Sequence, residues 1–180
     1  MSSRPRPLIA AIGLTALASM ALGAAPAPVP DAHDKVHAQL SKAYKATTKY
    51  HSEKKAIKDG YMRTDECAAS PEGGMGYHYI NLDHIDSLDP AKPAALLYED
   101  DKHGKRRLVG VEYLVVDDDQ DLATDDDRPT LFGQEFAGPM EGHGPGMPIH
   151  YDLHVWLHKH NPSGLFAEWN PTVKCPAPVD

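Results

Sequence analysis

Basic charge, cysteine and long apolar runs are all scarce in this sequence. Its 180 residues include 18 lysines and arginines against 26 aspartates and glutamates, a formal net charge of −8. An acidic chain is poorly suited to nucleic acid or to an anionic membrane surface, so neither is expected as a partner. The one long apolar run, residues 8–22, lies near the N-terminus and is too short for a typical membrane span.

Several catalytic signatures are also missing. The sequence has no nucleophile elbow, no phosphate-binding loop and no dinucleotide fingerprint, which excludes the enzyme classes built on those motifs. The acidic segment 117–127 begins like a calcium-binding loop. However, Leu122 stands where such a loop needs glycine and Arg128 where it needs glutamate, so an EF-hand is excluded. We expect a solvated loop that the fold can do without.

The N-terminal segment has the layout of a secretory signal peptide. Arg4 and Arg6 precede the uncharged apolar run, and small residues follow it from Gly23 to Ala27. We therefore expect residues 1–25 to be removed on export. The protein would then be secreted or kept in the periplasm or cell envelope, with 16 basic and 26 acidic residues and a net charge of −10.

The rest of the chain is long enough for one domain with one core. Residues 26–33 are expected to be a proline- and alanine-rich linker, and residues 34–180 to fold together. The chain has two cysteines, Cys67 and Cys175. An even number of cysteines in an oxidising compartment favours a disulfide bond, so we expect these two to be paired. The alternative, free thiols or metal ligands, lacks ligand spacing around either cysteine.

Hydrophobic periodicity predicts one long helix followed by strands. Apolar residues recur every three or four positions up to Asp59, Gly60 is placed to end the helix, and Asp31 or Asp34 can cap its start. Strands are predicted at 76–81, 94–99 and 107–116, with a further short one at 131–136, and loops at 61–74 and 138–148. The predicted fold is α+β, a curved antiparallel sheet or half-barrel packed against one long N-terminal helix.

The segment from Met147 to Pro162 carries the most informative pattern. As a strand it would place imidazole and carboxylate groups on one face and apolar side chains on the other. The polar face would hold His150, Asp152, His154, Trp156, His158 and His160, and the apolar face Tyr151, Leu153, Val155 and Leu157. Neutral imidazole is the commonest side-chain ligand of transition metals, so this face is a candidate metal site.

Two other predicted strands each carry one ligand-competent residue that packing does not explain. His78 alternates with two tyrosines, and Glu112 is the only charge in the apolar run 108–116. We predict that His78, Glu112, His150 and His154 bind one divalent transition-metal ion: zinc, copper or iron. Asp152 is an alternative ligand or orients one of the histidines. A polar cluster without metal, with Glu112 accepting hydrogen bonds from the histidines, is the alternative.

This prediction depends on the shape of the last strand. Residues i and i+4 of a regular strand lie about 13 Å apart, so His150 and His154 can share one ion only if the strand is bent. If the strand is regular, one of them drops out and Asp152 becomes the better partner of the other. The preceding loop offers further candidate ligands, Met140, His143 and Met147, whose thioethers and imidazole suit copper. The alternative is that these methionines pack on aromatic residues.

Four segments cover nearly all of the chain after the signal peptide: DGYMRTDEC (59–67), GGMGYHYIN (73–81), LVGVEYLV (108–115) and LFGQEFAGPMEGHGPGMPIHYDLHVWLHKHNPSGLFAEWNP (131–171). In these segments the sequence resembles a group of exported bacterial proteins of unknown function. The resemblance implies one complete domain of that group. It implies no activity and no ligand set.

The function predicted from these residues is that of an exported metal-binding protein with an open His/Glu site, acting as a metal-dependent oxidoreductase or hydrolase. The alternatives are a non-catalytic copper- or zinc-handling protein and a small-ligand-binding module without metal. The expected partner is thus a metal ion or a small molecule. Whether the protein is an enzyme, which substrate it takes and how many subunits it forms stay open at this point.

Overall fold

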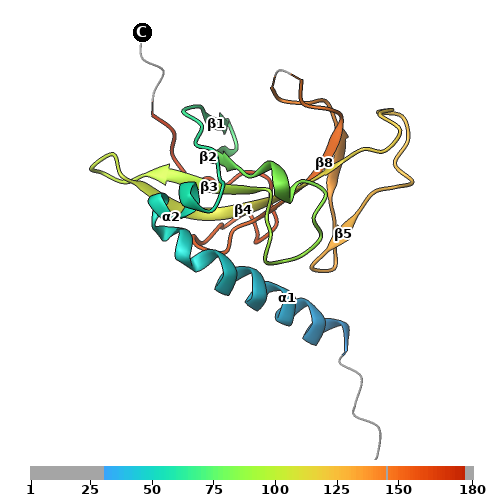
Figure 1. Cartoon of the computed structure of the whole chain (residues 1–180), viewed down its shortest axis with the longest axis horizontal. Coiled ribbons are helices and arrows are strands. Elements are labelled where there is room, and N and C mark those ends of the chain that lie inside the picture. Colours follow the sequence, from blue (N-terminus) through green and yellow to red (C-terminus); the bar gives the residue numbers. More distant parts are fainter. Residues whose placement is uncertain (1–30, 145, 177–180) are drawn as a thin grey trace, which may run out of the picture.

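A six-stranded antiparallel sheet, in the order β1-β2-β3-β4-β8-β7, dominates the fold. The structure is a computed structural model and describes residues 31–144 and 146–176. The sheet curls into a half-barrel, and helix α1 runs across one of its faces (Figure 1). These features confirm the predicted α+β class and curved sheet. The predicted signal peptide lies outside the described residues, as does most of the predicted linker.

The strands of the main sheet are β1 (Cys67–Ser70), β2 (Gly73–Ile80), β3 (Ala95–Asp100), β4 (Arg106–Val116), β7 (Ala137–Met140) and β8 (His150–Val155). The strands predicted at 94–99 and 107–116 are confirmed as β3 and β4, which form a hairpin with Gly104 in its turn at a φ of +71°. The segment predicted as one more strand is instead a small hairpin of β5 (Thr130–Leu131) and β6 (Gln134–Glu135). The edge strands β1 and β7 were predicted as loops, because four residues with few apolar side chains give no clear alternation.

The helical elements are α1 (Ala32–Thr47), the 3-10 turns η1 (Thr48–His51) and η2 (Leu82–His84), and α2 (Glu53–Lys58). Of the two candidate caps, Asp31 caps α1, accepting a hydrogen bond from the Asp34 amide. The single helix predicted to reach Asp59 is interrupted at Ser52, whose backbone is extended. The Thr48 hydroxyl donates to a carbonyl of the preceding turn, a local hydrogen bond that disfavours further helix. Among the described residues, no helix combines the length and the hydropathy that a membrane span requires.

The two faces of the sheet differ in character. The face toward α1 carries the main core, which includes Tyr77, Tyr79, Val111, Tyr113, Tyr151, Leu153 and Val155. Neighbours of these residues point to the opposite face, because side chains alternate along a strand. That opposite face carries His78, Glu112, His150, Asp152 and His154, beside a small apolar cluster of Leu97, Val109, Trp156 and Val173. The candidate ligands therefore lie on the face away from α1.

The C-terminal segment is tied to the β1 end of the sheet. Cys67 and Cys175 form a disulfide bond, as predicted. The backbone of Asn170 pairs with that of Gly74 in β2, and the side-chain oxygen of Asn170 accepts a hydrogen bond from the Thr172 amide. The tail thus folds back over the sheet instead of extending from it.

The acidic loop between β4 and β5 is anchored by Gln120, which is hydrogen-bonded to the backbone of Ile149, and by one of its aspartates. Asp127 accepts a hydrogen bond of 2.7 Å from the hydroxyl of Tyr151 in β8 and one of 2.8 Å from the Asp118 amide. Asp125 and Asp126 are exposed, and Asp125 pairs with Arg128 at the surface. The prediction that the whole loop is dispensable therefore applies to Asp125 and Asp126, and not to Asp127.

Serine substitutions separate these two parts of the loop. Replacing Asp125 and Asp126 together should change the free energy of unfolding by no more than about 0.5 kcal/mol, because exposed substitutions away from special features cost little. Asp127→Ser should lower the Tm by more than the double variant does, because the Tyr151 hydroxyl then loses its acceptor. Thermal melts of the variants test this prediction, and equal Tm values would contradict it.

Candidate metal centre

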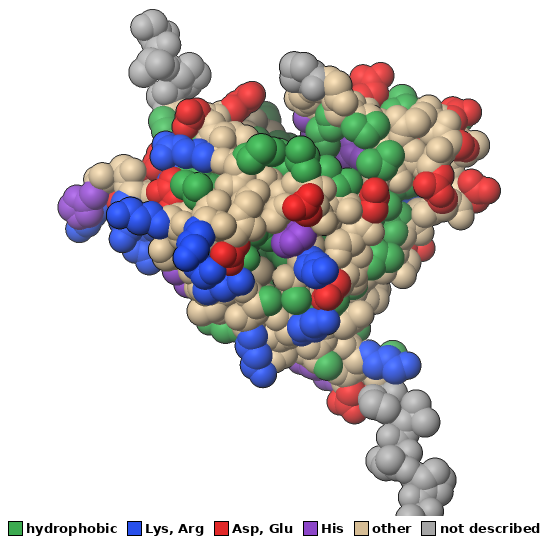
Figure 2. All heavy atoms as spheres, in the orientation of Figure 1, with side chains coloured by type: hydrophobic (Ala, Val, Ile, Leu, Met, Phe, Trp, Pro, Cys, Tyr) green, Lys and Arg blue, Asp and Glu red, His purple; other side chains and the backbone are tan. Residues whose placement is uncertain are grey.

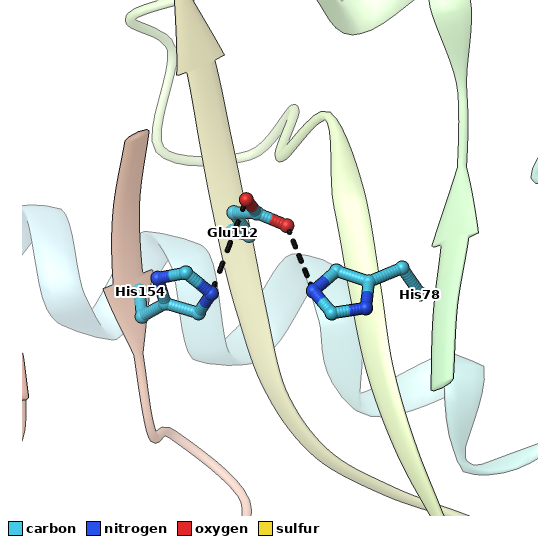
Figure 3. A group of neighbouring side chains, drawn as sticks. All are labelled: His78, Glu112 and His154. Atoms are coloured by element: carbon cyan, nitrogen blue, oxygen red, sulfur yellow. Dashed lines mark ion pairs between the residues drawn. The ribbon is translucent and has the colours of Figure 1, made fainter. Parts of the chain in front are cut away.

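Three strands each contribute one side chain to a compact group on the face away from α1. His78 comes from β2, Glu112 from the middle of β4 and His154 from β8, and the three side chains converge (Figure 3). One ligand atom from each lies within 4.8 Å of the other two. These three residues could hold one metal ion.

The register of the sheet brings the group together. Glu112 is directly opposite His154 in the β4 and β8 ladder, and such cross-strand pairs point to the same face. On its other side Glu112 is paired with Ala95 of β3, whereas His78 is paired with Leu97, two positions farther along. The His78 ring must therefore reach diagonally across β3 toward Glu112, as Figure 3 shows. The small side chain of Ala95 leaves that path open.

The distances between the ligand atoms suit a single ion. The Nε2 atom of His78 is 3.4 Å from Oε2 of Glu112, and Nε2 of His154 is 3.9 Å from Oε1. Both separations are shorter than about 4.2 Å, twice a metal–ligand bond of about 2.1 Å, so one ion could bind the carboxylate and either nitrogen. Small side-chain movements would complete the geometry.

The Nε2 atom of His154 gives the clearest sign that a partner belongs here. It is buried and has no hydrogen-bond partner in the part of the chain that the structure describes, since the Glu112 oxygen at 3.9 Å is too far away. A buried nitrogen left unpaired costs about 1–3 kcal/mol. The other ring nitrogen, Nδ1, is 3.7 Å from Oδ1 of Asp152. A carboxylate at that position is the usual way in which a metal-binding histidine is oriented.

The pKa values of the three side chains indicate that the group is protonated at neutral pH. Burial raises the pKa of Glu112 to about 7. The charge of His154 lowers this pKa, and the charge of Asp152 raises it. Burial alone would lower the pKa of His154, but Glu112 and Asp152 outweigh burial and raise this pKa to about 9. Burial lowers the pKa of His78, and so does the charge of His154. At neutral pH His78 is therefore neutral, and His154 and Glu112 together hold at least one proton.

Metal binding near pH 7 should release about one proton, because the ion displaces it from these two ligands. The pKa of His154 is raised, so its proton stays bound at pH 7 and leaves as the pH rises toward 9. Zinc affinity should therefore increase across that range. Calorimetric titrations in PIPES and in Tris measure the released proton through the different ionisation heats of the buffers. Equal heats in the two buffers would contradict the prediction.

His150, the fourth predicted ligand, lies apart from the group. The pairing of β4 with β8 continues without a shift from Val155 to His150, so β8 is regular and His150 stands about 13 Å from His154. The sequence analysis predicts that in a regular strand only one of the two histidines belongs to the metal site, with Asp152 as its partner. The structure has this arrangement, with Asp152 beside His154. The other candidate ligands, Met140, His143 and Met147, belong to β7 and the loop that joins it to His150.

The predicted strand is also shorter than expected. β8 ends at Val155, and the next amide, that of Trp156, donates to the carbonyl of Leu165 in the C-terminal segment. His158 turns toward the helix, where its Nε2 lies 2.9 Å from the Thr47 hydroxyl. The predicted polar face was therefore wrong at His158, because the chain leaves the sheet before that position.

A small pocket adjoins the His154 side of the group. Its volume is about 140 Å³, and its lining includes Asp152, His154, Phe166 and Glu168. Neither Glu112 nor His78 lines it. Glu168 adds to the negative charge that raises the pKa of His154. Nothing in the sequence pattern indicated Glu168, because it lies in a segment without regular structure that only the fold brings to β8.

Comparison of the chain with models of protein families, with curated proteins and with solved structures gives no match. The resemblance to exported bacterial proteins therefore stays a prediction. The functional argument rests on the geometry of His78, Glu112 and His154.

Proposed function

We propose that the protein is an exported metal-binding protein that holds one divalent transition-metal ion through His78, Glu112 and His154. Two imidazoles and one carboxylate form the ligand set of catalytic zinc sites and of non-haem iron(II) sites. The observation that carries the proposal is the buried, unpartnered Nε2 of His154 facing the Glu112 carboxylate. An ion between them would satisfy both groups.

The exposure of the three ligands supports an open site. The side chains of His154 and Glu112 are 1% and 7% exposed, whereas that of His78 is 20% exposed. Two buried ligands would thus anchor the ion, and solvent would approach from the His78 side. Structural zinc sites are closed by four protein ligands, whereas this group of described residues has three members. The fourth position would be taken by water or substrate.

This arrangement favours a metal-dependent hydrolase or oxidoreductase over a storage protein. A bound ion would supply Lewis acidity and a more acidic water molecule. Residues of the chain would orient the ligands and balance the charge of the ion. Asp152, 3.7 Å from Nδ1 of His154, would after a small movement accept a hydrogen bond from it and so keep the lone pair on Nε2 for the ion. The buried carboxylate of Glu112 would offset the charge of the ion in surroundings of low polarity.

Titration of tag-free protein with zinc, iron(II), copper(II) and manganese tests the proposal. His33 and His37, whose Nε2 atoms are 3.2 Å apart on the exposed face of α1, should first be replaced by alanine, because such a pair can bind metal by itself. We expect one ion per chain in this background. The ¹⁵N chemical shifts of His78 and His154 should change on binding. No binding, or binding without change in these two imidazoles, would contradict the proposal.

A further inference from the structure

His150 has the features of a metal ligand without belonging to the first group. Its Nδ1 is 3.1 Å from the carbonyl oxygen of Pro148, and a carbonyl accepts only, so Nδ1 carries the proton. Nε2 is then left with a lone pair. It is buried, the residue is only 2% exposed, and among the described residues it has no hydrogen-bond partner. Fixing one ring nitrogen to a backbone carbonyl is a common way of presenting the other to a metal.

A second imidazole packs against the His150 ring, and a methionine is paired with His150 across the sheet. The ring of His143 packs edge to face against that of His150, with centroids 5.1 Å apart. Met140 of β7 is directly opposite His150 in the ladder, so both side chains point to the same face of the sheet.

The loop between β7 and β8 brings in a second thioether. Gly142 has no room for a side chain, because a Cβ atom there would lie 2.0 Å from the Met147 carbonyl oxygen and 2.8 Å from its Cβ. The two ends of the loop are therefore in contact, and Met147 stands next to the residue that precedes His143. Figure 2 shows histidine atoms among hydrophobic side chains in the upper part of the molecule, near the place of this loop in Figure 1.

We propose that His143, His150, Met140 and Met147 form a second metal site, built from none of the three ligands of the first and selective for copper(I). Thioether sulfur and imidazole are ligands that favour copper(I), and the four residues include no carboxylate of the kind that the first site uses. The site goes beyond the proposed function, because it binds a different ion through different residues. It also accounts for the unpartnered Nε2 of His150.

Anaerobic competition for copper(I) against the chromogenic chelator bicinchoninate tests this site, again in the background without His33 and His37. Met140→Leu/Met147→Leu removes both sulfurs while nearly preserving side-chain volume. Loss of ligands should cost at least as much affinity as loss of a supporting residue, about 10–100-fold. His143→Gln, at an exposed position, should show a loss of similar size. Met62→Leu at another exposed methionine is the matched control and should have no effect.

The two sites should respond independently. The double leucine variant should keep its zinc affinity, and Glu112→Gln should lose zinc affinity but keep copper(I) affinity. Unchanged copper(I) affinity in the double leucine variant would overturn the second site and leave the first untouched. Loss of copper(I) in Glu112→Gln would also overturn it, because the copper would then sit in the first site.

Discussion

Replacing Glu112 with glutamine should lower zinc affinity by about 100-fold or more while the protein still folds. Replacing a residue that only orients a metal ligand already lowers metal affinity by about 10–100-fold. The change at Glu112 removes the one anionic ligand of the group. Glutamine has the shape of glutamate and keeps the packing of β4. It also removes a carboxylate whose burial is unfavourable. The chain without metal is therefore expected to stay folded.

Thermal stability gives the readout for this variant. At a zinc concentration about 100 times the dissociation constant, binding stabilises the folded state by about 2.7 kcal/mol. The parent protein should show this increase and Glu112→Gln should lose it. Glu72→Gln, at an exposed glutamate in the turn between β1 and β2, is the matched control and should behave as the parent. A zinc-dependent rise in Tm that persists in Glu112→Gln would remove Glu112 from the site.

Loss of the disulfide should have the largest effect on stability. Cys67 and Cys175 are 108 positions apart, and closing a loop of about 100 residues is worth about 4.7 kcal/mol in the chain-entropy model. Cys67→Ser/Cys175→Ser should therefore lower the free energy of unfolding by about 4–5 kcal/mol. The C-terminal segment should also loosen over the apolar cluster to which Val173 contributes.

Urea unfolding of the double serine variant beside the oxidised parent measures this loss. Reduction and alkylation of the parent should have a similar effect. Zinc affinity should survive under native conditions, because β2, β4 and β8 are held together by the sheet and not by the disulfide. A loss below about 1 kcal/mol would contradict the prediction and would indicate a reduced chain that keeps much of its structure when unfolded.

The strand alternation in the sequence was enough to identify most of the candidate site. Glu112 stands alone as a charge in an apolar run, and His78 alternates with tyrosines that pack in the core. These are local patterns with period two, and they predicted the face on which each side chain lies. The same alternation placed His150 and His154 together on the face opposite the core residues of β8.

Which histidine joins Glu112 depends on contacts that local sequence does not encode. The register that sets His154, and not His150, opposite Glu112 comes from the alignment of β4 with β8. The reach of His78 depends on the small side chain of Ala95 in the intervening strand. Both features require the assembled sheet. The sequence analysis missed the interruption at Ser52 and the short edge strands. Local conformational preferences are weak in these segments, so contacts with neighbouring elements determine their structure.

Anomalous diffraction at the zinc edge, from crystals of the background variant without His33 and His37 grown with zinc, tests the central claim most directly. The structure predicts one strong peak at about 2.0–2.2 Å from Nε2 of His78, Nε2 of His154 and a carboxylate oxygen of Glu112. The side chains of these residues should move little, since their ligand atoms already lie within 4.8 Å of one another. A fully occupied zinc ion bound elsewhere, with no density between these three side chains, would contradict the claim.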